Sequence, residues 1–255
     1  MKKTIIALFA LAGMTQAATV ITFGGTSASA DYGFVTDAFV IDSNTGTDFF
    51  SFEHELSDGN KFSLTNTDGN NASKFWAGKD GKIAGTWSNT AALTEMNAAM
   101  GISYTADELG TGSGMYFTAP GNGGSKSTLT FDFSQAAAGD TITMYVMATA
   151  YAGDLSAFDV TGLNGASVAY ATNGGNGFST TAAYSQGGGH ITIFKVTGTL
   201  TDADVALTPG AGVKSGFQSV AYAITPAATP SIPEPTTATL SLLALAGLAA
   251  RRRRK

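Results

Sequence analysis

Thr141-Ile-Thr-Met-Tyr-Val-Met-Ala-Thr149 is the stretch that decides the fold. Apolar and other residues alternate along it, and the same alternation recurs in Thr128–Phe133 and Phe217–Ile224. The residues that share one face in the three segments are Ile142, Met144, Val146 and Ala148, then Leu129, Phe131 and Phe133, then Val220, Tyr222 and Ile224. A period of two with threonine on the other face is typical of antiparallel strands that cover a core on one side. These segments predict a half-buried β-sheet.

Shorter segments of the same kind run along the whole middle of the chain. They are Val20–Phe23, Phe34–Ile41, Phe49–Glu53, Lys61–Thr65, Phe75–Trp76, Ile83–Trp87, Met115–Thr118, Ser167–Ala171 and Ile191–Thr197. Turn-forming residues separate them, as in Ser57-Asp-Gly-Asn60 and Lys79-Asp-Gly-Lys82. About twelve short strands with such turns are typical of an all-β fold, here an antiparallel, jelly-roll-like β-sandwich. We expect it to occupy residues 18–225.

One or two short helices interrupt the strands. Asn89 or Thr90 is a suitable N-cap for a helix, and Gly101 is a suitable end. Leu93, Met96 and Met100 would form its apolar stripe. A second helical turn is expected at Thr105–Leu109, before Gly110.

Composition excludes several classes of function. The chain has no cysteine, which excludes disulfides, thiolate catalysis and cysteine-ligated metals. Both chain ends are basic: without them, seven of the 14 basic residues and 18 of the 19 acidic residues remain, a net charge of about −11. All seven remaining cations are lysines. An acidic surface without arginine repels nucleic acid, so we expect no nucleic-acid partner.

The N-terminus predicts export. Lys2 and Lys3 form a positive segment, and the apolar run Thr4–Met14 follows. Thr15-Gln16-Ala17 then ends in a small residue, as signal peptidase requires. We predict a signal peptide over residues 1–17, helical in its apolar part, with cleavage after Ala17.

The C-terminus combines three different elements. Pro233-Glu234-Pro235 holds Glu234 extended and outside any helix, because proline fixes φ and lacks an N–H. The apolar run Ala238–Ala250 predicts a membrane-spanning helix that is shorter than the ~20 residues of a comfortable span. Five cations then end the chain and would stay on the cytoplasmic side: Arg251, Arg252, Arg253, Arg254 and Lys255. Residues 226–232 are rich in proline and predict a stiff linker.

This tail resembles the PEP-CTERM sorting signal of bacterial surface proteins. The resemblance covers residues 233–255 only. It implies delivery to the cell envelope, with an exosortase-type membrane enzyme recognising the motif and the helix acting as a transient inner-membrane anchor. It also implies a Gram-negative-type envelope and frequent association with exopolysaccharide. It implies no activity for the domain that precedes it.

Few residues of that domain are arranged for catalysis or metal binding. Glu53-His54-Glu55 places two carboxylates on one strand face, about 6–7 Å apart, a separation that could suit a glycosidase. A solvated strand face explains the same residues. Asn66–Asn71, Asp58-Gly-Asn60 and Asp202-Ala-Asp204 are rich in oxygen ligands for calcium. Turn formation explains them equally well, so no metal ligand and no cofactor is assigned.

Two tryptophans are the candidates for contact with a sugar. Trp76 and Trp87 lie on either side of the Lys79–Lys82 turn. Exposed indole rings would stack on sugars, and buried ones would fill the core. The sequence therefore predicts an exported, non-enzymatic protein of the cell surface or extracellular matrix. A polysaccharide-binding module is the alternative, and a secreted glycosidase is the third possibility.

Overall fold

The computed structural model describes residues 17–24, 37–40, 51–66, 73–76, 87–107, 114–117, 127–152, 158–180, 191–201, 204–209 and 214–228. Within these ranges the chain forms 13 strands and one helix. The strands are β1 (Thr19–Gly24), β2 (Asp37–Val40), β3 (Ser51–Glu55), β4 (Lys61–Asn66), β5 (Ser73–Trp76), β6 (Gly114–Phe117), β7 (Ser127–Asp132), β8 (Thr141–Ala152), β9 (Phe158–Thr161), β10 (Leu163–Thr172), β11 (Ile191–Leu200), β12 (Asp204–Pro209) and β13 (Lys214–Thr225). The helix is α1 (Thr90–Met100).

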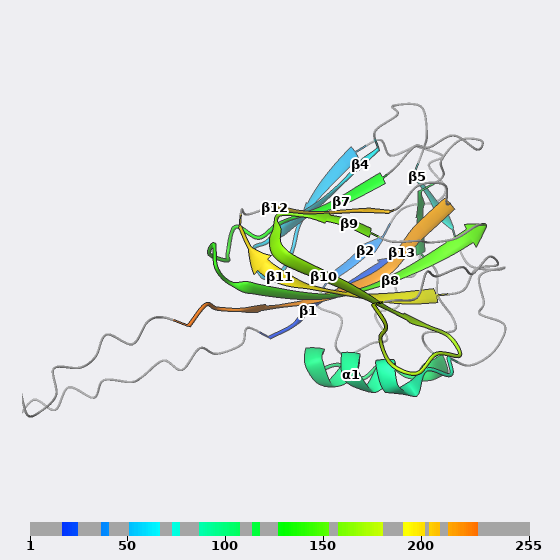
Figure 1. Ribbon diagram of the computed structural model, residues 1–255. Coiled ribbons are helices and arrows are strands. Elements are labelled where there is room, and N and C mark those ends of the chain that lie inside the picture. The colour runs from blue at the N-terminus through cyan, green and yellow to red at the C-terminus, as the bar shows by residue number, and fades with distance from the viewer. Residues whose placement is uncertain are drawn as a thin grey trace, which may run out of the picture.

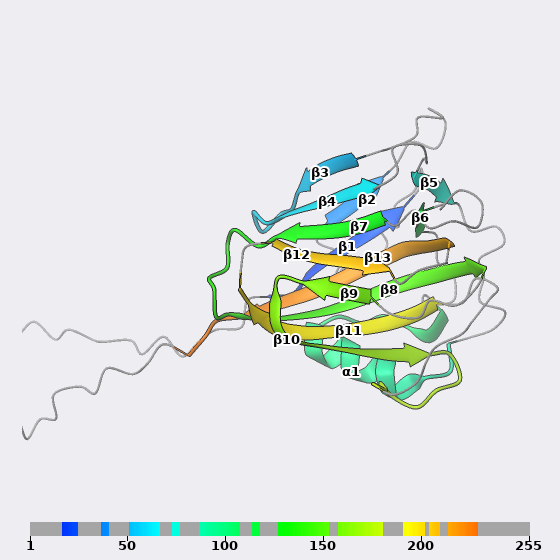
Figure 2. The same ribbon diagram turned by 45° about the horizontal axis from the view of Figure 1, so that its top comes forward.

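The strands form two sheets, as the sequence predicts. The large sheet has the order β10-β11-β8-β13-β1-β2, and β6 and β5 extend it beside β13. The small sheet has the order β3-β4-β7-β12-β9. Figures 1 and 2 show the small sheet lying over one face of the large sheet. The pairing is antiparallel apart from one pair: β2 runs parallel to β1, with Ile21 opposite Asp37. An all-antiparallel prediction is wrong there.

An inner core fills the space between the two sheets. It contains every residue that the alternation of the three long segments placed on a shared face. The small sheet adds Phe62, Val205 and Leu207, and the large sheet adds Ile21, Phe194 and Val196. Phe131 stacks on Phe133 with ring centroids 5.6 Å apart, and Tyr222 meets both rings edge-on. The period-two pattern therefore predicted this core correctly.

A second, outer core lies between α1 and the opposite face of the large sheet. Figure 1 shows α1 on that face, away from the small sheet. It contains Val20, Tyr145, Met147, Ile193 and Ala221 from the sheet. From the helix and its flanks it contains Trp87, Ala92, Leu93, Met96, Met100 and Tyr104. The central strand β8 is consequently buried on both faces. The expectation of a core on one side only is wrong here, because the helix covers what would otherwise be the solvent face.

Helix α1 begins and ends where the sequence predicts. The side chain of Asn89 accepts a hydrogen bond from the backbone N–H of Ala92, which makes it the N-cap. Gly101 ends the helix with φ of 64°, a left-handed conformation that favours glycine. Leu93, Met96 and Met100 are buried against the sheet. The second predicted turn, Thr105–Leu109, lies partly outside the described residues.

From β7 onwards the chain passes repeatedly between the two sheets. The passage from β9 to β10 turns at Gly162, which has φ of 83°. A Cβ atom at this position would lie 1.9 Å from the backbone oxygen of Asp204, so only glycine fits. Strands β9 and β12 were not predicted. Each shows only one alternation of apolar residues, Phe158 with Val160 and Val205 with Leu207, which is too little to establish a period.

The first and last strands lie side by side. Thr19 of β1 pairs with Tyr222 of β13, so Ala17 and Thr225 leave the domain at the same end (Figure 1). Within the described ranges, no helix is long and apolar enough to cross a membrane. The predicted signal helix, the Ala238–Ala250 helix and the sorting motif all lie outside those ranges.

Candidate functional site

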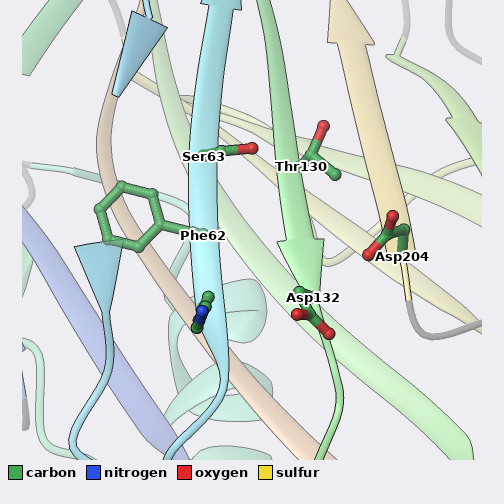
Figure 3. Close-up of a pocket in the computed structure, with 6 residues that line it drawn as sticks. Phe62, Ser63, Thr130, Asp132 and Asp204 are labelled. Atoms are coloured by element: carbon green, nitrogen blue, oxygen red, sulfur yellow. The ribbon is translucent and has the colours of Figure 1, made fainter. Parts of the chain in front are cut away.

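The outer face of the small sheet carries a shallow hollow of about 190 Å³. Neighbouring strands β4, β7 and β12 line it with Lys61, Ser63, Thr130, Asp132 and Asp204. Figure 3 shows Ser63, Thr130, Asp132 and Asp204 on their strands, with Phe62 pointing away from Ser63. The Phe62 side chain belongs to the inner core on the other face of the sheet, so the side chains that face the hollow are polar or charged.

The strand register brings one lysine and two carboxylates into a single row across the rim. Lys61 lies opposite Asp132, and Asp132 lies opposite Asp204 on the next strand. Directly opposed side chains in an antiparallel pair have Cβ atoms about 4.5–5.5 Å apart. The two carboxylates therefore face one another beside a lysine, with the hydroxyls of Ser63 and Thr130 one row further on. Such a set can accept and donate hydrogen bonds to a ligand that carries several hydroxyl groups.

Sequence reasoning did not find this hollow. Alternation places Lys61 and Ser63 together on one strand, and Thr130 and Asp132 together on another. Their grouping depends on the register between strands and on β12, which was not predicted. A search for adjacent polar positions on consecutive strands would have found two of the three walls.

The Glu53-His54-Glu55 triplet lies at the edge of the small sheet. It belongs to β3, where Glu53 pairs with Ser63 and Glu55 pairs with Lys61. Glu55 is exposed, and the ring of His54 packs 5.5 Å from that of Phe62. The described lining of the hollow includes none of these three residues. The glycosidase prediction stays a prediction, but this edge position does not support it.

The two tryptophans proposed for sugar contact have different outcomes. Trp87 is 1% exposed in the outer core, and its indole N–H donates to the backbone oxygen of Asn89 at 2.8 Å. Its ring faces are covered by protein, so glycan contact through Trp87 is wrong and the core alternative holds. Trp76 ends β5, and its side chain lies outside what the structure describes.

The turn at Asp58 is used within the fold. The Asp58 carboxylate accepts from the hydroxyl of Tyr222 at 2.5 Å, the hydroxyl of Thr19 at 2.7 Å, and the backbone and side-chain N–H groups of Asn60 at 3.0 Å. Burial acts to raise the pKa of Asp58, but these hydrogen bonds outweigh it and the pKa is lowered. Burial, the hydrogen bond and the charge of Asp58 together raise the pKa of Tyr222.

No calcium site emerges from the turns that the structure describes. The Asp58 carboxylate already accepts hydrogen bonds from protein donors, and Asn60 is fully buried, so neither side chain is presented to a calcium ion. In the described part of the chain, no three acidic or histidine side chains lie close enough to share a metal ion. Asn66 is the last residue of β4, and residues 67–71 and 202–203 lie outside the described ranges.

A second buried carboxylate holds the end of the domain. Asp140 is 8% exposed, and its two oxygens accept from the backbone N–H groups of Ala227 at 2.8 Å and Ala137 at 2.9 Å. Its own backbone oxygen accepts from Leu200. Asp140 therefore fastens the first residues after β13 to the loop between β7 and β8.

Taken together, these features define a two-sheet β domain with one covering helix, whose two ends leave it side by side. The tail beyond this domain supplies its identity. A family model described as the PEP-CTERM protein-sorting motif matches residues 231–255. The predicted resemblance is confirmed, so the chain is an exported protein with a sorting signal for an exosortase-type enzyme. Export is to the cell envelope or surface.

The domain that the tail delivers has no counterpart in the comparisons. No curated protein and no solved structure matches the chain. The motif match covers only the end of the chain, and its function there is sorting.

Proposed function

We propose that this protein is a non-enzymatic component of the cell surface or extracellular matrix, held at the inner membrane until its C-terminal signal is processed. Signal peptidase would first cleave after Ala17. Pro233, Glu234 and Pro235 would then present the motif to the exosortase-type enzyme. The helix Ala238–Ala250 would hold the chain, and Arg251–Lys255 would fix its orientation. The β domain, of jelly-roll-like connectivity, is the delivered part.

One observation carries this proposal: the sorting motif begins six residues after the last strand. Only the short proline-rich linker 226–232, whose last two residues belong to the match, lies between the folded domain and Pro233. The two covered faces of the large sheet give the domain a rigid body without any disulfide. A domain stabilised by two packed cores needs no disulfide to remain folded outside the cell.

The experiment is replacement of Glu234. Glu234→Ala should block processing, while export and membrane association stay intact. The precursor should accumulate in the membrane fraction, about 2 kDa heavier than the mature form. Mass spectrometry of the wild-type protein from the cell surface should find no Lys255. Finding Lys255 there would replace the sorting signal by an ordinary tail anchor.

A second candidate function is binding of a polysaccharide in the hollow of the small sheet. The carboxylates of Asp132 and Asp204, the lysine and the two hydroxyls offer both acceptors and donors for sugar hydroxyls. Calorimetric titration with exopolysaccharide fragments tests this. Asp132→Asn should weaken binding by about tenfold. Asp159→Asn, an exposed change on β9 outside the hollow, should leave it unchanged. Equal binding by both variants would contradict the site.

A further inference from the structure

The two ends of the domain meet two loops at one end of the sandwich. Thr19, at the start of β1, donates to Asp58 in the turn between β3 and β4. Asn60 in the same turn accepts from the backbone N–H of Gln135, in the loop between β7 and β8. That loop holds Ala227 through Asp140. We call this end the base: residues 18–19, 56–60, 134–140 and 225–228.

The start of the tail is hydrogen-bonded to the base. Asp140 holds Ala227, and the loop that contains Asp140 is itself held to β11, since Gly139 donates to Leu200 and Leu200 donates to Asp140. Glu234 lies seven residue steps after Ala227. At about 3.3–3.6 Å per extended residue, they reach at most about 25 Å. An enzyme that processes the motif at the membrane therefore has the base close beside it.

The base also differs from the rest of the domain in charge. Its ranges contain no lysine, arginine or glutamate, and two aspartates only, Asp58 and Asp140. Both carboxylates accept hydrogen bonds from protein donors. Exposed residues here are neutral and, apart from Gln135, small: Ser57, Ser134, Ala137, Ala138, Thr225 and Ala228 among them. Charged side chains begin just beyond these ranges, at Glu55, Lys61 and Asp132. Within them, an end whose only two charges are hydrogen-bonded to protein donors is repelled little by an anionic lipid surface.

We propose that the base is the membrane-facing surface of the domain while the protein awaits processing, and that Asp140 is the positioning residue that keeps it there. The partner is the lipid surface around the processing enzyme. The inference rests on the proposed function, because it needs the tail to be in the membrane. Without the contact between Asp140 and Ala227, two more residues would join the tether and the domain would turn more freely.

The absence of cysteine makes the orientation measurable. Single cysteines are placed at exposed positions on the base, Ser134→Cys, and near the opposite end, Asn176→Cys, after β10. Both are made in the Glu234→Ala precursor, and spheroplasts are treated with a polymer-linked maleimide that cannot cross a membrane. A domain that lies base-down for nine-tenths of the time should label about tenfold more slowly at Ser134→Cys. In detergent the two cysteines should react alike.

Two changes then test the positioning role. Asp140→Ala should bring the labelling rate of Ser134→Cys close to that of Asn176→Cys. A Gly/Ser insertion after Ala228 that doubles the tether should do the same without touching the domain. Thr201→Ala is the control, because Thr201 bonds Gly162 and not the tail. Melting temperatures of all variants, measured on soluble domains, check the fold.

The outcomes separate the two proposals. Equal labelling of the two cysteines in the membrane-held precursor overturns the orientation. Persistent protection of Ser134→Cys in both the Asp140→Ala and the insertion variants overturns the role of Asp140. If Glu234→Ala does not accumulate in the membrane fraction, the sorting proposal itself fails, and that result is read from fractionation before any labelling.

Discussion

The inner and outer cores share the large sheet but are built differently. The inner core lies between two sheets and is rich in phenylalanine, with Phe62, Phe131, Phe133, Phe194 and Phe217 all buried. The outer core contains more alanine and methionine and only one described helix. Side-chain hydrogen bonds fasten its edges. The comparison teaches that the inner core is stabilised by buried area, and the outer core depends more on hydrogen bonds that hold a cover in place.

Those hydrogen bonds are concentrated at the two ends of the helix. Asn89 donates to the backbone oxygens of Thr172 and Gly177 and accepts from the N–H of Gly177 at 2.8 Å. Asn97 donates to the backbone oxygen of Tyr104 and accepts from its N–H. Because α1 is held over the sheet mainly at its two ends, we expect it to detach before the two sheets unfold.

The largest expected effect is in the inner core. Phe131→Ala removes a ring that touches Phe62, Phe133 and Tyr222. It should destabilise the domain by about 3–5 kcal/mol, because it leaves a cavity between two rigid sheets. Urea denaturation measures the change. Thr130→Ala, the half-buried neighbour on the outer face, should change stability by less than about 1 kcal/mol. A similar loss from both variants would contradict an inner core stabilised by buried area.

Met96→Ala tests the outer core by the same kind of truncation. Met96 is a residue of α1, and its side chain is fully buried in the outer core. The expected loss is about 2–3 kcal/mol, the low end for such a change, because the helix can settle toward the sheet. Hydrogen exchange should quicken in α1 and leave β7 protected. Uniform quickening in both elements would show that the cover and the sheets unfold as one.

Asn89→Ala removes the N-cap and the hydrogen bonds to the loop after β10 together. The expected loss is about 1–2 kcal/mol, above a simple cap, because two carbonyl oxygens lose a donor. Calorimetry of the domain measures it. Thr90→Ala, at the exposed first position of the helix, is the matched control. Equal melting temperatures for the two variants would contradict the idea that these hydrogen bonds hold α1 over the sheet.

Asp58, which holds Tyr222 of the inner core, gives the stability of the domain a pH dependence. Its pKa is lower in the folded protein than the ordinary value of 3.8, so its stabilising effect is present above that value and is lost as pH falls through the folded pKa. Asp58→Asn should lower the melting temperature at pH 7 and leave it nearly unchanged in strong acid. The difference between the two proteins, scanned from neutral pH into acid, is the measurement. A difference that stays constant would contradict the carboxylate's role.

The smallest effect is expected at the surface ion pair between helix and sheet. Lys195 donates to Glu95 at 2.5 Å, with both side chains about one-third or more exposed. Lys195→Met should cost less than about 1 kcal/mol, and the cost should fall further in salt. Chemical denaturation at low and high salt measures it. A larger, salt-independent loss would mean that the lysine stem contributes by packing against Tyr145 and Phe178.

Prediction from sequence succeeded where one local period decides the structure. The inner faces of β7, β8 and β13, the cap at Asn89 and the end at Gly101 all follow from neighbouring residues. It failed where a distant segment decides. Tyr145 and Met147 are buried only because α1 covers them, and no pattern within β8 reveals that. The hollow needs three strands in register, and one of them, β12, has too little alternation in its sequence to be recognised.

The pairing of β1 with β13 has a consequence for timing. Thr19 leaves the ribosome first, yet its partner Tyr222 follows roughly 200 residues later. At synthesis rates of about 5–20 residues per second, that gap lasts about 10–40 s. Until then β1 has an unsatisfied edge, and pairing across so long a separation is slow. The proposed membrane-held stage would thus give the newest strand time to close the sheet before the chain is released among its own copies.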